Sequence, residues 1–207
     1  MNGRIVLYLA FATIFTSLSA DNFFNIKSQN RGYSNTLVTI PNAIPFEAPL
    51  LSKKKISHIL RVINSARVVS QVCGGARFSA TSKFRWNNML YKAAYEHTND
   101  MVKSGIFSHY GSATANDWTY SVQNLSRASY VRERAENNGY IHFKALGENV
   151  ASGYPTIEQT LKQWLSSPGH CRLLMNPRYK EIGVAYLSRS KDPLRYRHYW
   201  TIVFGDR

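Results

Sequence analysis

The fold of this chain is decided by two short stretches, Gly-Glu-Asn at residues 147–149 and Trp-Leu-Ser-Ser-Pro-Gly-His-Cys at residues 164–171. They place the carboxylate of Glu148 and the imidazole of His170 beside Pro and Gly, which punctuate secondary structure. They also include Cys171, one of only two cysteines in the chain. A carboxylate and an imidazole in such motifs indicate a polar site.

Two further histidines stand in tight motifs of their own. His109 ends a Phe-Ser-His motif, and His198 opens a row of alternating apolar residues near the C-terminus. Alternate side chains of a strand share one face, so His198 is predicted at the end of an apolar row, where a cleft wall would lie. We therefore expect one polar site assembled from distant segments, consisting of His109, Glu148 and His198 with His170 at the rim.

The N-terminus predicts export. Arg4 provides a positive start, residues 5–15 are apolar, and small residues follow, as in a cleaved secretory signal. The apolar run is shorter than the roughly 20 residues that a membrane helix needs, so no transmembrane segment is expected in the mature form. The predicted organisation is a signal peptide over 1–20, an extended or disordered lead-in over 21–54 and one folded domain over 55–207. The mature protein is expected to be secreted or periplasmic.

The chain is strongly basic, with 26 Lys and Arg against 12 Asp and Glu and a net charge of +14. Cleavage of the signal would lower this by one charge, because Arg4 is its single charged residue. Such a charge either keeps the surface hydrated or attracts an anionic partner such as lipid headgroups or envelope polymer. Export and the lack of a nucleic-acid-binding module argue against a specific nucleic-acid partner.

Cys73 and Cys171 are the only cysteines. In an oxidising compartment they are expected to form one disulfide. Two free thiols or a metal-binding pair remain alternatives, although the spacing typical of paired cysteine ligands is absent.

Periodicity predicts the main elements of the domain. Helical spacing of apolar residues begins near Lys55 and is expected to end before Gly74, and a second helix is expected over 87–104, with Gly105 ending it in a left-handed conformation. Further expected elements are a short helix over 129–138, a helix opened by Thr156 and ending at Pro168, and strands around 182–186 and 198–204. His97 falls on the apolar face of the second helix and is read as a core residue; His58 and His142 have no motif and are also left out of the site.

The ordered set of these motifs resembles the CAP superfamily, the cysteine-rich secretory, antigen 5 and pathogenesis-related group that shares the SCP domain, in its bacterial branch. The match covers roughly Ile56 to Gly205. The motifs that carry it are Asn64-x-x-Arg67, Cys73-Gly74, Trp86-Asn87-x-x-Leu90, Phe107-Ser108-His109, Gly147-Glu148-Asn149, Trp164-x-x-Ser167-Pro168-Gly169-His170-Cys171, Asn176-Pro177, Ile182-Gly183-Val184-Ala185 and Tyr199-Trp200-Thr201-x-x-Phe204-Gly205.

The resemblance implies an α+β fold, an α-β-α sandwich with a central, largely antiparallel sheet between helices. It also implies a cleft in which two histidines and one or two glutamates bind a divalent metal. Carried over, the histidines are His109 and His198 and the first glutamate is Glu148. The second glutamate has no counterpart, because Ser167 stands in its place. His170, in a Ser-Pro-Gly-His turn, is expected on that side of the cleft.

The chemistry of these residues also fits a weak site for zinc or another divalent cation, because neutral imidazoles and a carboxylate are suitable ligands. Alternatively the groups only hydrogen-bond one another, or Glu148 acts through water. The expected function is a secreted, non-catalytic binding or interaction module, with sterols, fatty acids or anionic envelope components as its partners. The alternative is a metal-dependent hydrolase of peptide or cell-wall material, although zincin and nucleophile-elbow signatures are both absent.

Overall fold

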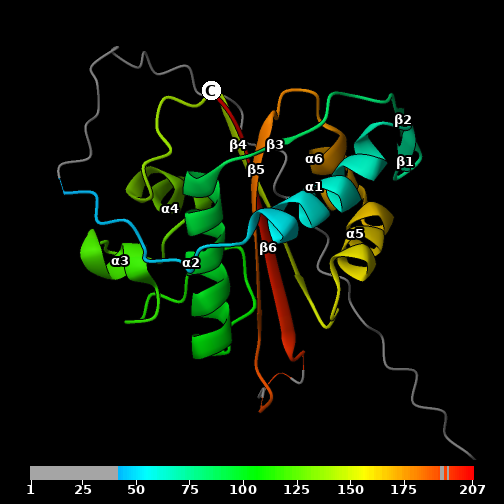
Figure 1. Ribbon diagram of the computed structural model, residues 1–207. Coiled ribbons are helices and arrows are strands. Elements are labelled where there is room, and N and C mark those ends of the chain that lie inside the picture. The colour runs from blue at the N-terminus through cyan, green and yellow to red at the C-terminus, as the bar shows by residue number, and fades with distance from the viewer. Residues whose placement is uncertain (1–41, 192–193, 195) are drawn as a thin grey trace, which may run out of the picture. The chain divides into compact units, whose positions relative to one another are not determined.

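The computed structural model describes residues 42–191, 194 and 196–207 (Figure 1). The chain divides into two units, 1–35 and 36–207, and every described residue belongs to the second. The predicted signal peptide and the first part of the lead-in lie outside the described residues. Among the residues described, no helix combines the length and the apolar character needed to cross a bilayer.

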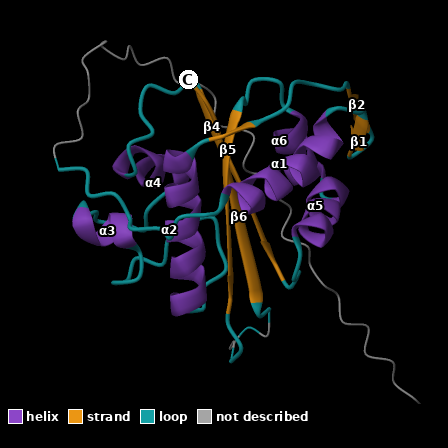
Figure 2. Ribbon diagram, in the orientation of Figure 1, coloured by secondary structure: helices purple, strands orange, loops and turns teal. Residues whose placement is uncertain are grey.

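The domain is a four-stranded sheet with helices on both faces (Figure 2). The strand order is β3-β5-β6-β4; β4, β5 and β6 pair antiparallel, and only the two-residue β3 is parallel to its neighbour. This confirms the predicted α+β class. The strands are β1 (Gln71–Cys73), β2 (Ala76–Phe78), β3 (Arg85–Trp86), β4 (Ala145–Ser152), β5 (Glu181–Ser188) and β6 (His198–Asp206). The helices are α1 (Lys53–Arg67), α2 (Asn88–Ser104), α3 (Trp118–Val122), α4 (Val131–Asn137), α5 (Ile157–Ser166) and α6 (Pro168–Met175).

Alternation along the strands builds two cores. Trp200, Ile202 and Phe204 of β6 belong to the core beneath α1 and α5. Val203 belongs to the second core, beneath α2. The predicted period-two pattern at the C-terminus is therefore confirmed, and it separates the two faces of the sheet.

Helix α2 lies close against the sheet and has well-defined ends. Its N-cap, Asn87, accepts hydrogen bonds from two main-chain N–H groups of the first turn, and Gly105 ends the helix at φ 73°, as predicted. The close approach requires Gly183 of β5, because a Cβ there would overlap the backbone of Leu90 and Tyr91. Glycine at this strand position thus sets the distance between helix and sheet.

The other predicted helices form with slightly different ends. The helix near Lys55 is α1, the short one is α4, and the one opened by Thr156 is α5, whose N-cap hydroxyl accepts from the Gln159 N–H. Six of the described elements had no sequence prediction: the short strands β1, β2 and β3, helix α3, strand β4, and helix α6, which begins where a turn was expected. Pro168 is the first residue of α6, where a missing N–H costs no hydrogen bond.

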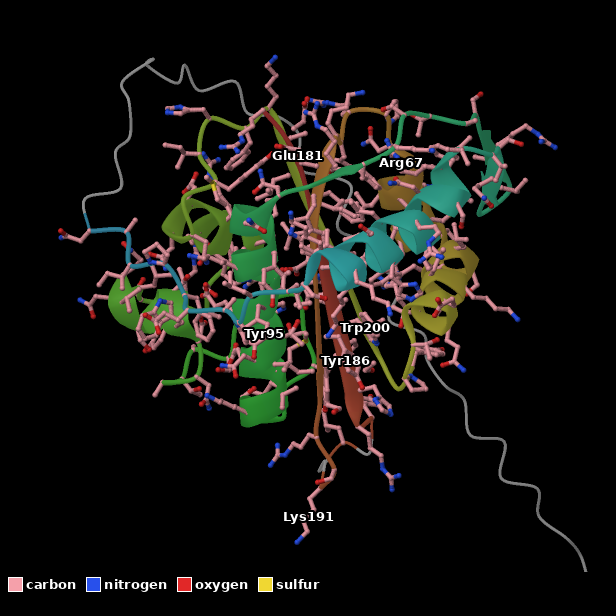
Figure 3. All side chains as sticks on the ribbon, viewed as in Figure 1. Arg67, Tyr95, Glu181, Tyr186, Lys191 and Trp200 are labelled. Carbon is pink, nitrogen blue, oxygen red and sulfur yellow. A yellow bond between two sulfur atoms is a disulfide. The ribbon has the colours of Figure 1, made fainter. Side chains whose placement is uncertain are left out.

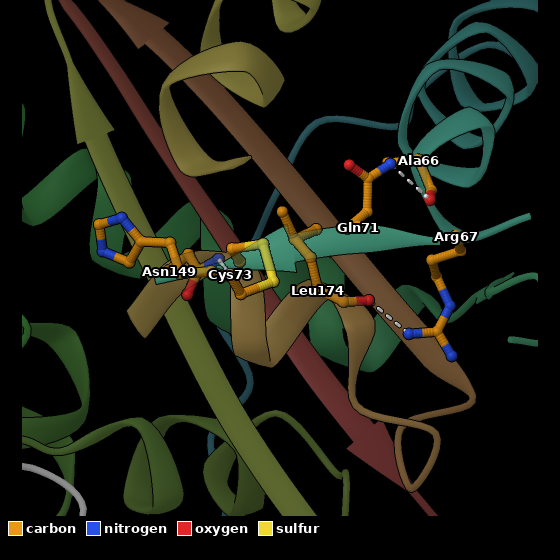
Figure 4. Close-up of a disulfide and its surroundings, with 8 residues drawn as sticks. Ala66, Arg67, Gln71, Cys73, Asn149 and Leu174 are labelled. Atoms are coloured by element: carbon orange, nitrogen blue, oxygen red, sulfur yellow. Dashed lines mark hydrogen bonds between the residues drawn. A yellow bond between two sulfur atoms is a disulfide. The ribbon is translucent and has the colours of Figure 1, made fainter. Parts of the chain in front are cut away.

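The two cysteines form the predicted disulfide (Figure 4). The bond joins Cys73, at the end of β1, to Cys171 in α6, with the two Cα atoms 5.4 Å apart. Both residues are buried. The disulfide thereby fixes the small β1–β2 hairpin to the helix that carries His170.

The described part of the lead-in before α1 contains no helix or strand and is held by side chains of α2, α3 and α4. Asn137 exchanges hydrogen bonds with the main chain of Ile44, and Asn138 accepts one from the N–H of Phe46. The Phe46 ring packs edge-on against Trp118, with centroids 5.8 Å apart. These residues are therefore part of the packed domain.

Candidate functional site

Glu148 is the centre of a buried polar cluster at the edge strand of the sheet. It pairs with Val203 in the β4–β6 register, so its side chain lies on the face covered by α2 and α4. Its Oε2 atom accepts a hydrogen bond of 2.9 Å from Nη2 of Arg134, and its Oε1 atom lies 3.1 Å from Nδ1 of His109. The carboxylate side chain is 3% exposed.

Arg134 of α4 organises this cluster. Besides Glu148, its guanidinium donates to the main-chain oxygens of Ser129 and His109, and its side chain is 1% exposed. Burial by itself would raise the pKa of Glu148, but the charge of Arg134, helped by His97 and His109, lowers it to about 2. Glu148 is therefore an anion throughout the physiological pH range.

His97 borders the cluster from α2. Its Nε2 lies 2.8 Å from the carbonyl oxygen of Ser108 and 3.8 Å from Oε1 of Glu148. Burial, followed by the charge of Arg134, lowers the pKa of His97 to about 4, so the ring is neutral. A carbonyl can only accept, which places the proton on Nε2 and leaves Nδ1 as a buried acceptor without a protein partner. Its packed, hydrogen-bonded position agrees with the sequence interpretation.

His170 reaches the same cluster from the other side of the sheet. The side chain of Asn149, next to Glu148 but on the opposite face of β4, donates to the carbonyl of His170, so the start of α6 is tied to this edge strand. The imidazole rings of His170 and His109 have centroids 6.4 Å apart. Burial, then the nearby His109, lowers the pKa of His170 to about 4, and its buried Nδ1 has no protein partner.

His198 does not join this site, so the prediction that it converges with Glu148 is wrong. It lies opposite Ser188 on β6, five residues from Val203 and on the other face of the sheet. There its Nδ1 lies 2.8 Å from the hydroxyl of Tyr186, and the two rings stack at 15°. Tyr186 in turn packs on Trp200, and both are marked in Figure 3.

The residues that the structure brings together are His109, Glu148 and His170. The described residues include no group of three or more His, Cys, Asp or Glu side chains arranged to hold a metal ion. Both carboxylate oxygens of Glu148 already have partners, so Glu148 orients His109 through Nδ1. In such an arrangement, Nε2 is the atom through which His109 would ligate a cation. The Nδ1 atom of His170 is buried and has no protein partner, and two neighbouring imidazoles would suit a weak site for a borderline cation.

Sequence reasoning missed Arg134 and did not include His97. Arg134 lies in a run of charged residues, which usually marks a solvated helix face. His97 shares the apolar stripe of α2, and that stripe predicts burial without predicting what the ring will face. No sequence signal distinguished these two residues from ordinary surface and core positions.

Comparison with known proteins shows which family this sequence matches. The sequence model described as "Cysteine-rich secretory protein family" (CAP) matches residues 60–204. Among curated Bacillus subtilis proteins, the chain is 29% identical to the uncharacterized membrane protein YlbC over 107 residues, 50% of this chain and 25% of that protein. It is 43% identical to the uncharacterized protein YkwD over 47 residues, 23% of this chain and 18% of that one. The matches thus span a quarter or less of these relatives.

Solved structures show the same fold. An extracellular protein from Bacillus anthracis with an SCP domain superposes with a TM-score of 0.53 at 19% identity, covering 77% of this chain and 45% of that one. An outer surface protein from Borrelia burgdorferi gives a TM-score of 0.51 at 17% identity, covering 75% of this chain and 91% of that one. With the family match over most of the described domain, these results establish that the chain belongs to the cysteine-rich secretory protein (CAP) family.

Proposed function

We propose that this chain is an exported, non-catalytic binding module in which His109 and His170 bind a divalent cation such as zinc. The observation that carries the proposal is the buried, unpartnered Nδ1 of His170 beside His109, whose own Nδ1 is engaged by Glu148. A buried polar atom without a partner is costly unless something satisfies it. The extracellular and outer-surface character of two proteins with this fold supports export.

Glu148 serves this site as a positioning group for His109. A carboxylate behind a ligating histidine fixes the ring and makes it a better ligand. Because Arg134 already compensates the charge of Glu148, the cation would meet a site of no net negative charge. We therefore expect weak binding that needs no rearrangement of the buried ion pair.

The alternative, a metal-dependent hydrolase of peptide or cell-wall material, needs a general base that titrates near the working pH. Glu148, with a pKa of about 2 and both oxygens hydrogen-bonded, is a poor base. The same geometry that positions His109 therefore favours binding over catalysis.

Calorimetric titration of zinc into the mature chain tests the proposal. We expect His109→Ala and His170→Ala each to abolish zinc binding, because each removes one of the two imidazoles. His198→Ala is the matched control and should bind zinc like the parent, since His198 lies on the other face of the sheet.

The outcome that would overturn the metal site is zinc binding by His170→Ala equal to that of the parent. A parallel assay addresses catalysis: if the zinc-loaded protein hydrolysed peptide or peptidoglycan and His109→Ala did not, the hydrolase alternative would replace the binding module.

A further inference from the structure

One end of the domain joins the C-terminal turn of α2 to the segment that links β5 and β6. Nη1 of Arg189 donates a 2.8 Å hydrogen bond to the carbonyl of Val102. The ring of Phe107, just after α2, lies 5.6 Å from the ring of Tyr196, just before β6. In Figure 1 the end of α2 and the β5–β6 connection both lie at the lower end of the view. We call Lys103, Ile106, Phe107, Lys191 and Tyr196 the α2–β6 tip.

The α2–β6 tip exposes large apolar side chains close together. Ile106 is 46% exposed, Phe107 36% and Tyr196 40%. The rings of Phe107 and Tyr196 both pack on the ring of Tyr199, which is fully buried. These contacts hold the two exposed rings in place on the domain. Adjacent exposed apolar groups on a soluble domain mark surfaces that contact something else.

The charged residues of the α2–β6 tip are basic. Lys103 and Lys191 are exposed, and Lys191 projects from the end of the sheet in Figure 3. The acidic residue of the last turns of α2, Asp100, is buried and accepts hydrogen bonds from Ser112. The tip therefore offers aromatic and aliphatic groups flanked by positive charge, on a chain whose net charge is +14.

We propose that the α2–β6 tip is a peripheral docking surface for an anionic lipid bilayer. Aromatic rings and aliphatic groups enter the headgroup boundary, while lysines at the same level are attracted to anionic headgroups. Charge complementarity selects this occupant: the exposed lysines would meet anionic headgroups while the apolar groups leave water. The inference rests on the proposed non-catalytic binding role and names its partner, but it uses none of the His109–His170 site.

Co-sedimentation of the mature chain with vesicles tests this surface. The parent should bind vesicles of phosphatidylglycerol and phosphatidylcholine and bind pure phosphatidylcholine weakly. The double variant Ile106→Ser/Lys191→Gln should bind the anionic vesicles at least about tenfold more weakly, since one lysine near the surface accounts for about fivefold. The matched control, Val72→Ser/Lys54→Gln, removes one exposed aliphatic group and one exposed lysine elsewhere and should bind within about twofold of the parent.

Equal weakening by both double variants would show diffuse attraction to the whole basic surface and would overturn the assignment, as would a parent that does not prefer anionic vesicles. Zinc titration of the same variants separates this inference from the metal site. Ile106→Ser/Lys191→Gln should bind zinc normally, and His170→Ala should bind vesicles normally. If the parent does not bind zinc, but Ile106→Ser/Lys191→Gln still weakens vesicle binding more than the control variant does, only the metal proposal is contradicted.

Discussion

At the scale of single residues, the ion pair of Arg134 and Glu148 is the most consequential contact of the site. Both side chains are almost fully removed from water, and Arg134 also holds the loop that carries His109 through its main-chain oxygen. Two buried charges satisfy each other, but one without the other leaves an uncompensated charge in the interior. The pair therefore links the stability of the domain to the geometry of the site.

Arg134→Ala is expected to lower the free energy of unfolding by about 3–5 kcal/mol, because Glu148 loses its charged partner. Urea denaturation measures this. The control is Arg132→Ala, two positions away: its side chain is 57% exposed, and its pair with the partly buried Glu136 should contribute under about 1 kcal/mol. Replacement of both partners in Arg134→Met/Glu148→Leu should recover much of the loss; equal destabilisation by the single and double variants would argue against an uncompensated charge as the cause.

At the scale of elements, the site is built where α2, α4, β4 and α6 meet at one edge of the sheet. Edge strand β4 supplies Glu148 to one face and Asn149 to the other, and Asn149 anchors the start of α6 so that His170 approaches His109. On the α2 side, the distance between helix and sheet depends on Gly183. The positions of His97 and Ser108 follow from that distance, since both belong to α2 or the loop after it.

Gly183→Ala is expected to lower the free energy of unfolding by at least about 1–3 kcal/mol, because the added methyl group overlaps the backbone of α2 and forces the helix away from the sheet. Thermal unfolding followed by circular dichroism measures this. Ser188→Ala, at an exposed position of the same strand, should change stability by less than about 0.5 kcal/mol. A Gly183→Ala protein as stable as the parent would mean that α2 does not lie this close to the sheet.

At the scale of the whole molecule, stability depends on pH through several buried groups that titrate in opposite directions. Burial lowers the pKa values of His97 and His170 to about 4. As pH falls below about 6.5, these two histidines therefore become protonated in the unfolded chain while they stay neutral in the folded chain. Burial raises the pKa of Glu96 to about 7, so the folded chain gains one proton before the unfolded one. The net effect between about pH 6.5 and 4.5 is lost stability.

As pH falls through that window, we expect the free energy of unfolding to fall by at most about 1.4 kcal/mol per pH unit, the value for one net proton. Burial also raises the pKa of Asp100, which acts in the same direction as Glu96 and makes the loss smaller at the acidic end. Below about pH 4.5 the loss should continue, because Glu148 has a folded pKa of about 2 and a higher one when unfolded. His97→Gln removes one of the two histidine protons and should flatten the dependence between pH 6.5 and 4.5. Urea midpoints measured across this range check the slope, and an unchanged slope in His97→Gln would contradict the assignment.

Local signals in the sequence were sufficient for the disulfide, the limits of α2 and the alternation of β6. Each of these depends on residues close together in the chain or on the only available pair: an Asn cap, a Gly at positive φ, a period of two, and two cysteines. The motifs also identified His109, Glu148 and His170 as members of one site, and the structure brings these three together.

Only the tertiary structure decided which face of the sheet each side chain occupies. The register of β4 on β6 places Glu148 opposite Val203, and because alternate residues of a strand face opposite ways, His198 is excluded from the site. The same register leaves α4 beside Glu148, so that Arg134, which the sequence marks as a surface residue, becomes its buried counter-ion. Strand register and helix placement are set by contacts between distant segments, and no local pattern carries that information.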